Sequence, residues 1–181
     1  ILLGLAMGSG TVFSIRFGQK DSVGLKEGII ASFALLSAVT VVLNILIFIS
    51  LDWIIWMLRT PAELTELMRE YLIVIFTGMI GIFLYNFFAS LLRSLGNSVT
   101  PLVFLAVAAY LNIILDLWFV AGLDRGVAGA AEATVISQYV SGIGIAIYTK
   151  VKFRELFKHD GRVRLRLTRI KEITNFSALT C

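Results

Sequence analysis

Five long apolar segments, each close to the length needed to cross a bilayer, constrain this chain more than any other feature. A helix that spans the hydrocarbon core needs about 20 mostly apolar residues, because it rises only about 1.5 Å per residue. Hydrophobic residues make up 58% of the 181 residues and charged residues only 15%, whereas soluble domains usually hold about 25% charged residues. We therefore predict an all-α fold, a polytopic transmembrane helical bundle with about five spans, at residues 1–17, 29–58, 67–92, 101–123 and 127–149.

The same pattern divides the chain into three parts. Residues 1–149 are the predicted membrane part, residues 150–172 form a basic connector, and residues 173–181 become apolar again, as at the start of a further helix. The chain opens on an apolar segment that has neither an initiator methionine nor a cleavage-site pattern, so this segment is not a signal peptide. We expect an internal piece of a longer membrane protein.

Cysteine and histidine are too scarce for several kinds of chemistry. The single cysteine, Cys181, excludes an intramolecular disulfide and a cysteine-built metal site. The single histidine, His159, lies in the basic connector with no cysteine beside it, which argues against a zinc site. No nucleophile–base pair stands out in the sequence, so we predict neither an enzyme nor a cofactor.

Basic residues are distributed unevenly between the two sides of the membrane that alternating spans define. One side holds Arg59, Arg69 and Arg125, whereas the other holds the basic residues of two connections and every basic residue after Thr149. Because cytoplasmic loops are enriched in lysine and arginine, the second side is predicted to be cytoplasmic. We therefore place the spans in the plasma (inner) membrane and residues 150–172 in the cytoplasm, and the net charge of +4 implies no nucleic-acid partner.

One carboxylate interrupts the fourth apolar segment. Asp116 lies within the otherwise uncharged residues 101–123, about six residues from the predicted outer end and therefore about 9 Å deep. A charged side chain at the centre of a membrane helix costs about 2.5–3.5 kcal/mol on insertion scales, so such residues usually serve a function. A carboxylate sheltered from water can bind a cation or hold a proton, and Asp116 therefore predicts a cation or proton site.

Oxygen-bearing side chains fall at similar depths on the neighbouring segments. Asn112 shares a helix face with Asp116, and Thr134 is about 10 Å deep on the following antiparallel segment. Asn86 can reach the same middle layer, and Gln138 shares the face of Thr134, where it can line a cavity or serve packing. Such oxygens suit Na⁺ or a proton rather than soft metals. We predict cation binding by Asn112, Asp116 and Thr134, with Asn86 and Gln138 behind them or in the cavity wall.

Helix packing is the alternative role for these polar residues, because serine, threonine and asparagine often hydrogen-bond between membrane helices. It is harder to argue for Asp116, since a charge costs more than an amide or a hydroxyl. Glu132 points about 200° away from Thr134 around the helix, near the outer end, where it can reach Arg125 or water. We interpret Glu132 and Asp52 as interfacial residues rather than ligands.

Several motifs, in their order and spacing, resemble those of one transporter family. Residues 92–101, which read Leu-Arg-Ser-Leu-Gly-Asn-Ser-Val-Thr-Pro, are similar to a loop signature of the MATE (multidrug and toxic-compound extrusion) family. Residues 4–21, 112–116 and 126–138 resemble the family's second, fifth and sixth helices. The resemblance implies helices two to six in the N-terminal lobe of a two-lobed, twelve-helix antiporter.

The resemblance also implies a site and a mechanism. Asn112, Asp116 and Thr134 match the family's cation ligands with the family's spacing, and Asn86 matches a further asparagine. The family site also uses an aspartate on the first helix, so the first helix and the second lobe, the lipid bilayer and a small organic substrate are the implied partners. Members of the family exchange Na⁺ or H⁺ for organic, often cationic, compounds by alternating access.

Two other functions stay open. One is a lipid-linked oligosaccharide flippase of the same superfamily, and the absence of lysine or arginine deep in the segments counts against it. The other is a structural membrane subunit without transport, which should tolerate replacement of Asp116 by asparagine.

Overall fold

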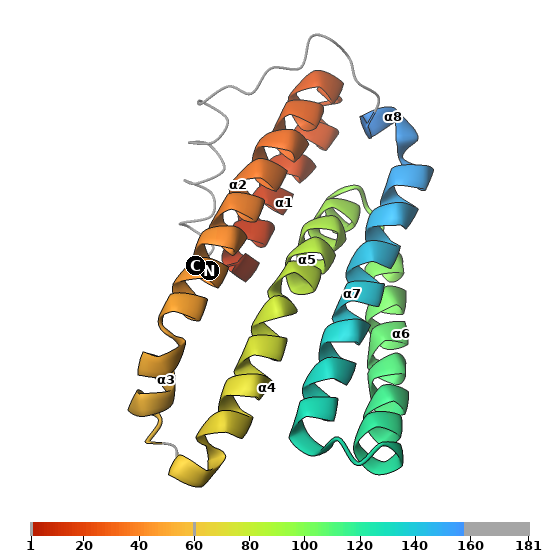
Figure 1. Ribbon diagram of the computed structural model, residues 1–181. Helices are drawn as coiled ribbons and strands as arrows, with labels where there is room; N and C mark the ends of the chain where they lie inside the picture. Colours follow the sequence, from red (N-terminus) through yellow and green to blue (C-terminus); the bar gives the residue numbers. More distant parts are fainter. Residues whose placement is uncertain (1, 60, 158–181) are drawn as a thin grey trace.

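The computed structural model describes residues 2–59 and 61–157 as a bundle of helices (Figure 1). No strand occurs in these two ranges, and the prediction of an all-α bundle is confirmed. The elements are, in chain order, α1 (Leu2–Gly18), α2 (Ser22–Ile49), α3 (Leu51–Met57), the 3-10 turn η1 (Ala62–Leu64), α4 (Thr65–Thr77), α5 (Met79–Ser94), α6 (Val99–Asp116), the π-helical segment η2 (Leu117–Gly122), α7 (Gly126–Lys152) and α8 (Arg154–Phe157).

Four stretches of the described residues are long and apolar enough to cross a membrane. They are Ser22–Ile49, Thr65–Ser94, Val99–Gly122 and Gly126–Lys152. The predicted first segment also forms a helix, α1, but its 17 residues fall short of the about 20 that a straight span needs. Most of the predicted connector 150–172 and all of residues 173–181 lie outside the described ranges.

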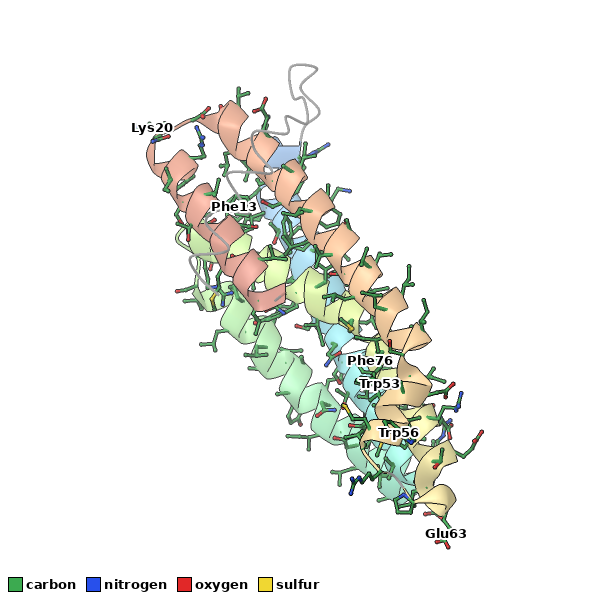
Figure 2. The ribbon with its side chains drawn as sticks, turned by 90° about the vertical axis from the view of Figure 1, so that its left-hand side faces the viewer. Phe13, Lys20, Trp53, Trp56, Glu63 and Phe76 are labelled. Atoms are coloured by element: carbon green, nitrogen blue, oxygen red, sulfur yellow. The ribbon has the colours of Figure 1, made fainter. Side chains whose placement is uncertain are left out.

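The connections alternate between the two ends of the bundle, as the predicted topology requires. The α1–α2 connection, the α5–α6 connection and α8 lie at one end, and the α3–α4 and α6–α7 connections lie at the other (Figure 1). Figure 2 shows Lys20 at the first end and Trp53, Trp56 and Glu63 toward the second. Trp53 and Trp56 are 60% and 74% exposed, which fits aromatic side chains at a membrane–water boundary. Which end faces the cytoplasm stays a prediction.

Short polar signals set the helix ends. α2 begins at Ser22, seven residues before the predicted span, because the Asp21 carboxylate accepts a hydrogen bond of 2.9 Å from the Gly24 backbone N–H. Gly96, in the connection between α5 and α6, has a φ of +84°, which glycine adopts without strain. The side chain of Asn97 then accepts from the Thr100 N–H at 3.1 Å and caps the start of α6.

Phenylalanine side chains fill the space between α1, α2 and α5. We call Phe13, Phe33, Phe83, Phe87 and Phe88 the aromatic cluster. Phe87 is 1% exposed, and its ring centroid lies 5.2 Å from that of Phe33 and 5.2 Å from that of Phe88, in edge-to-face arrangements. Such pairs add to the gain from burying the rings. This cluster fixes α5 against the first two helices.

Glycine lets α5 and α7 approach closely. A Cβ atom on Gly142 would lie 2.6 Å from the backbone oxygen of Gly81, and one on Gly81 would lie 3.0 Å from the backbone of Gln138. Neither atom could be accommodated without moving a backbone, so both positions require glycine. Small residues serve this purpose where membrane helices cross.

Candidate cation site

The structure joins two of the predicted ligands directly. Asn112 on α6 and Thr134 on α7 face each other, and the Asn112 amide lies 3.4 Å from the Thr134 hydroxyl oxygen. The Thr134 hydroxyl in turn donates to the backbone oxygen of Ala130, at 2.9 Å. The Asn112 side-chain oxygen is therefore not used in this bond and is free to act as an acceptor.

Asp116 lies one helical turn after Asn112 and is the last residue of α6. The residue is half-buried, and its Oδ1 atom is buried without a hydrogen-bond partner among the described residues. A buried acceptor without a donor is costly, and for a carboxylate the cost is greater than for a neutral group. The position thus provides an unpaired anionic oxygen beside the Asn112–Thr134 contact.

The helix changes its form immediately after Asp116. Residues Leu117–Gly122 form a π-helical segment, in which the Leu123 N–H donates to the Trp118 carbonyl at 2.9 Å, five residues earlier. A regular α-helix continuing to Leu123 would place Asp116 at the same membrane depth as Thr134. In the structure, the residue that hydrogen-bonds to Thr134 is Asn112 instead. Sequence reasoning found no signal for this segment, and single π turns occur frequently at functional sites.

Asn86 is not joined to the other predicted ligands. Its amide donates to the backbone oxygen of Ile82 on its own helix, at 2.8 Å. No hydrogen bond within residues 2–59 and 61–157 connects it to Asn112, Asp116 or Thr134. Its place in the cavity wall stays a prediction.

Gln138 faces a break in the third apolar segment. Its Oε1 atom is buried and has no hydrogen-bond partner within the described ranges, and it lies 2.7 Å from the position that a Cβ on Gly78 would take. Gly78 separates α4 from α5. Gln138 therefore packs on the break, with an oxygen that has no partner among the described residues one turn from Thr134. That it lines a cavity stays a prediction.

Side chains from two other helices hydrogen-bond to this break. Asn44 on α2 donates to the Phe76 carbonyl at 2.8 Å, and Tyr139 on α7 donates to the Thr77 carbonyl at 2.8 Å. A broken helix inside a membrane needs such partners for its backbone groups. Sequence reasoning missed Asn44 and Tyr139, and Gly78 was the signal that could have pointed to them.

The two acidic residues that the sequence predicts to be interfacial each form an ion pair with an arginine, near the end of the bundle that holds the α3–α4 and α6–α7 connections. Glu132 pairs with Arg125, and Asp52 pairs with Arg69. Both carboxylates are thereby compensated by arginine, which confirms that Glu132 reaches Arg125. That Asp116 is the carboxylate of a cation site stays a prediction.

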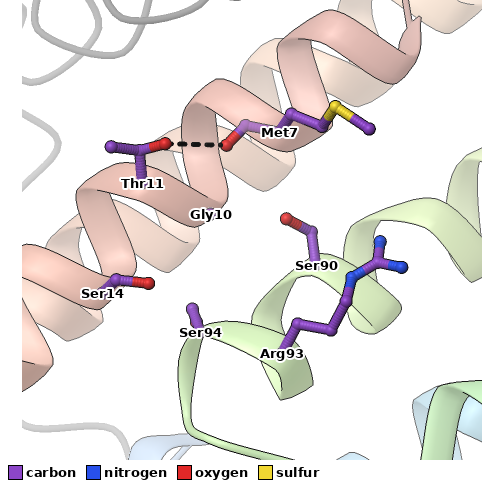
Figure 3. A pocket seen from close by; sticks show the side chains of 7 residues that line it. All are labelled: Met7, Gly10, Thr11, Ser14, Ser90, Arg93 and Ser94. Atoms are coloured by element: carbon purple, nitrogen blue, oxygen red, sulfur yellow. Dashed lines mark hydrogen bonds between the residues drawn. The ribbon is translucent and has the colours of Figure 1, made fainter. Parts of the chain in front are cut away.

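A separate groove runs along the contact between α1 and α5. Its volume is about 510 Å³, and its lining is rich in hydroxyl groups (Figure 3). The lining residues are Met7, Gly10, Thr11, Ser14, Ser90, Arg93 and Ser94. Ser90 donates across to the Ala6 carbonyl at 2.6 Å, which holds the two helices together. The groove contains none of the predicted cation ligands.

The arrangement suits weak binding of a hard cation or a proton rather than a tightly held transition metal. The described residues contain no group of three or more His, Cys, Asp or Glu side chains that could hold a metal ion. The Asp116 carboxylate, the Asn112 amide oxygen and the Thr134 hydroxyl are all oxygen donors. The Gln138 oxygen lies one turn further along α7.

A bundle with four apolar helices long enough to cross a membrane is the architecture of a polytopic integral membrane protein. A family model described as MatE matches residues 1–118. The chain belongs to the MATE family, whose members are transporters rather than enzymes.

Individual relatives agree with this assignment. The chain is 34% identical over 140 residues, or 77% of its length, to the "Probable multidrug resistance protein YpnP" of Bacillus subtilis. It is 31% identical over 172 residues, or 93% of its length, to the "Probable multidrug resistance protein NorM" of Thermotoga maritima. These matches cover 32% and 35% of the two relatives, so the chain spans about a third of their length.

Solved structures show the same fold. A crystal structure of MATE in the bent conformation superposes with a TM-score of 0.90 at 26% identity, covering 99% of this chain and 40% of that one. An inward-facing multidrug resistance MATE transporter of the MOP superfamily gives a TM-score of 0.82 at 27% identity, with the same coverage. The chain therefore corresponds to a part of the complete MATE fold.

Proposed function

We propose that the chain forms part of a secondary active antiporter that exports organic, often cationic, compounds in exchange for Na⁺ or H⁺. Membership of the MATE family supports export, and relatives named as multidrug resistance proteins support organic compounds as cargo. The observation that carries the coupling is the buried, unpartnered Oδ1 of Asp116 beside the Asn112–Thr134 contact. Because the chain covers 40% of the length of a solved MATE transporter, we propose that it acts together with the remaining helices of a longer protein.

In this proposal Asp116 carries the exchangeable charge. A cation or a proton on its carboxylate removes the cost of an unpaired anion, and its departure restores that cost. Asn112 and Thr134 contribute neutral oxygen atoms, so their affinity for the ion changes little with protonation. Two occupancy states with different electrostatic energies can favour two packings of the helices, as alternating access requires.

The test replaces Asp116 by asparagine, which keeps the shape of the side chain and removes its charge. Full-length protein in inverted membrane vesicles would be assayed for ethidium transport, with Na⁺ and pH gradients imposed separately. We expect Asp116→Asn to reduce gradient-driven transport to the level of vesicles without the protein. The matched control is Asp124→Asn in the α6–α7 connection, where asparagine tolerates the φ of +51°.

The same experiment separates the alternatives. A structural subunit without transport would show no gradient-driven ethidium movement even with Asp116 intact. A flippase would move a lipid-linked oligosaccharide rather than ethidium. Wild-type transport rates in Asp116→Asn vesicles would contradict the proposed role of this carboxylate.

A further inference from the structure

Two adjoining hollows lie where α1 ends and α8 begins. The first has a volume of about 480 Å³, and its lining includes Leu95, Lys152, Phe153 and Arg154. The second, of about 410 Å³, lies against the α1–α2 connection and includes Lys20. Phe17 and Leu156 line both hollows. We call the two together the headgroup groove.

The rim of the headgroup groove carries cations without acidic partners. Lys20, Lys152 and Arg154 are exposed, and none of them belongs to an ion pair among the described residues. The Lys152 ammonium lies 5.7 Å from the centroid of the Tyr148 ring. Asp21 also lines the groove, but its carboxylate is paired with Arg16 at 3.2 Å, so it leaves the other cations uncompensated.

Charges at the opposite end of the bundle are arranged differently. Arg69 is paired with Asp52 there, and Arg125 with Glu132. Arg59 at that end also has no ion pair among the described residues, but Lys20, Lys152 and Arg154 are three such cations around one groove. They would attract an anion that the described residues do not supply.

The base of the headgroup groove is apolar, which restricts the kind of anion. Phe17 is 51% exposed, and Leu95, Phe153 and Leu156 are half-buried beside it. Its lining comes from α8 and the α1–α2 connection, which lie at one end of the bundle (Figure 1), at the level expected for lipid headgroups. An occupant with a phosphate group and an attached hydrocarbon chain fits both the cationic rim and the apolar base.

The part of the chain after α8 is a poor source of the missing negative charge. Residues 158–181 carry six basic and two acidic residues. Its net charge has the same sign as the rim, so it would be repelled rather than attracted.

We infer that the headgroup groove binds one anionic phospholipid, with its phosphate between Lys152 and Arg154 and an acyl chain along Phe17 and Leu156. This binding is independent of the proposed cation site, and it can be measured without transport.

The test measures lipid binding to the full-length protein by native mass spectrometry, with dioleoyl phosphatidylglycerol and dioleoyl phosphatidylcholine as probes. We expect Lys152→Gln and Arg154→Gln each to weaken phosphatidylglycerol binding about fivefold and to leave phosphatidylcholine binding unchanged. The matched control is Lys150→Gln, because Lys150 is exposed two residues away on the same helix and lines neither hollow.

Two further measurements define the ligand. Phe17→Ser should weaken phosphatidylglycerol binding without changing the charge of the rim, and millimolar glycerol phosphate should not displace the lipid. Equal phosphatidylglycerol affinity in the Lys152→Gln and Lys150→Gln variants would overturn the inference. So would displacement by glycerol phosphate, which would indicate a phosphate site without lipid, or loss of thermal stability in the Gln variants equal to the loss of binding.

Discussion

The aromatic cluster and the contact between α6 and α7 both join apolar helices but are packed in opposite ways. Large rings fill the cluster, and Phe87 is 1% exposed. Along the second contact α7 presents small or hydroxyl-bearing residues to α6 and to the η2 segment that continues it. A Cβ on Gly129 would lie 3.1 Å from Phe119 of η2, and the Ser141 hydroxyl donates to the Phe104 carbonyl of α6 at 3.3 Å. We call this second contact the α6–α7 seam.

The difference indicates where the molecule is fixed and where it can respond. Interdigitated rings resist rearrangement, because any displacement opens a cavity. Helices joined through glycine and single hydrogen bonds have weaker and more exchangeable contacts. The proposed cation site lies in the α6–α7 seam, and the aromatic cluster holds the neighbouring helices in place.

Phe87→Ala is expected to have the largest effect on stability. Removing a buried phenylalanine costs about 3–5 kcal/mol, and Phe87 contacts several rings of the cluster. The unfolding free energy of the full-length protein in detergent micelles would measure this loss, while ethidium transport per folded molecule should be retained. A loss below about 1 kcal/mol would mean that the cluster relaxes to fill the cavity, and the contrast with the seam would fail.

Gly129→Val should have an intermediate effect. The added atoms would press on the Arg125 Cβ and on the backbone of Phe119, so the η2 segment that follows α6 must move away from α7 at a cost of about 1–3 kcal/mol. Both stability and ethidium transport should fall. Gly18→Val is the control, because a Cβ at Gly18 meets nothing within 4 Å. Equal effects of the two substitutions would show that the seam is loose rather than closely fitted.

Thr134→Val should have the smallest effect on stability and a selective effect on coupling. It preserves the shape of the side chain and removes one hydroxyl, and interhelical hydrogen bonds of this kind average about 0.6 kcal/mol. The concentration of the coupling ion at half-maximal transport should rise. Thr149→Val is the matched control, since its hydroxyl donates only to the Ile145 carbonyl, at 2.7 Å. If Thr134→Val and Thr149→Val leave the ion dependence equally unchanged, Thr134 is a packing residue.

Sequence alone predicted the helical class and the order of the apolar segments, because apolar run length is a local property. Sequence reasoning also predicted that Asn112 and Thr134 lie in one site between two helices. Antiparallel neighbours joined by a short connection place residues of similar membrane depth side by side. A period of 3.6 residues specified which residue of each turn faces the adjacent helix.

The contacts that sequence reasoning missed depend on distant parts of the chain. The bond from Asn44 to Phe76 joins residues 32 apart, and the bond from Tyr139 to Thr77 joins residues 62 apart. Apolar periodicity carries no information on which helices meet. The break at Gly78 was not predicted, because the run of apolar residues continues through it and the glycine was its only local signal.

The π-helical segment Leu117–Gly122 has a consequence for how the chain tolerates a change in length. Deleting one residue from a regular α-helix rotates everything beyond it by about 100° and shortens it by about 1.5 Å. A π turn holds one more residue between hydrogen-bonded groups than an α turn does. A single deletion between Asp116 and Gly122 can therefore convert the segment to a regular helix and leave the register of Asn112 against Thr134 unchanged.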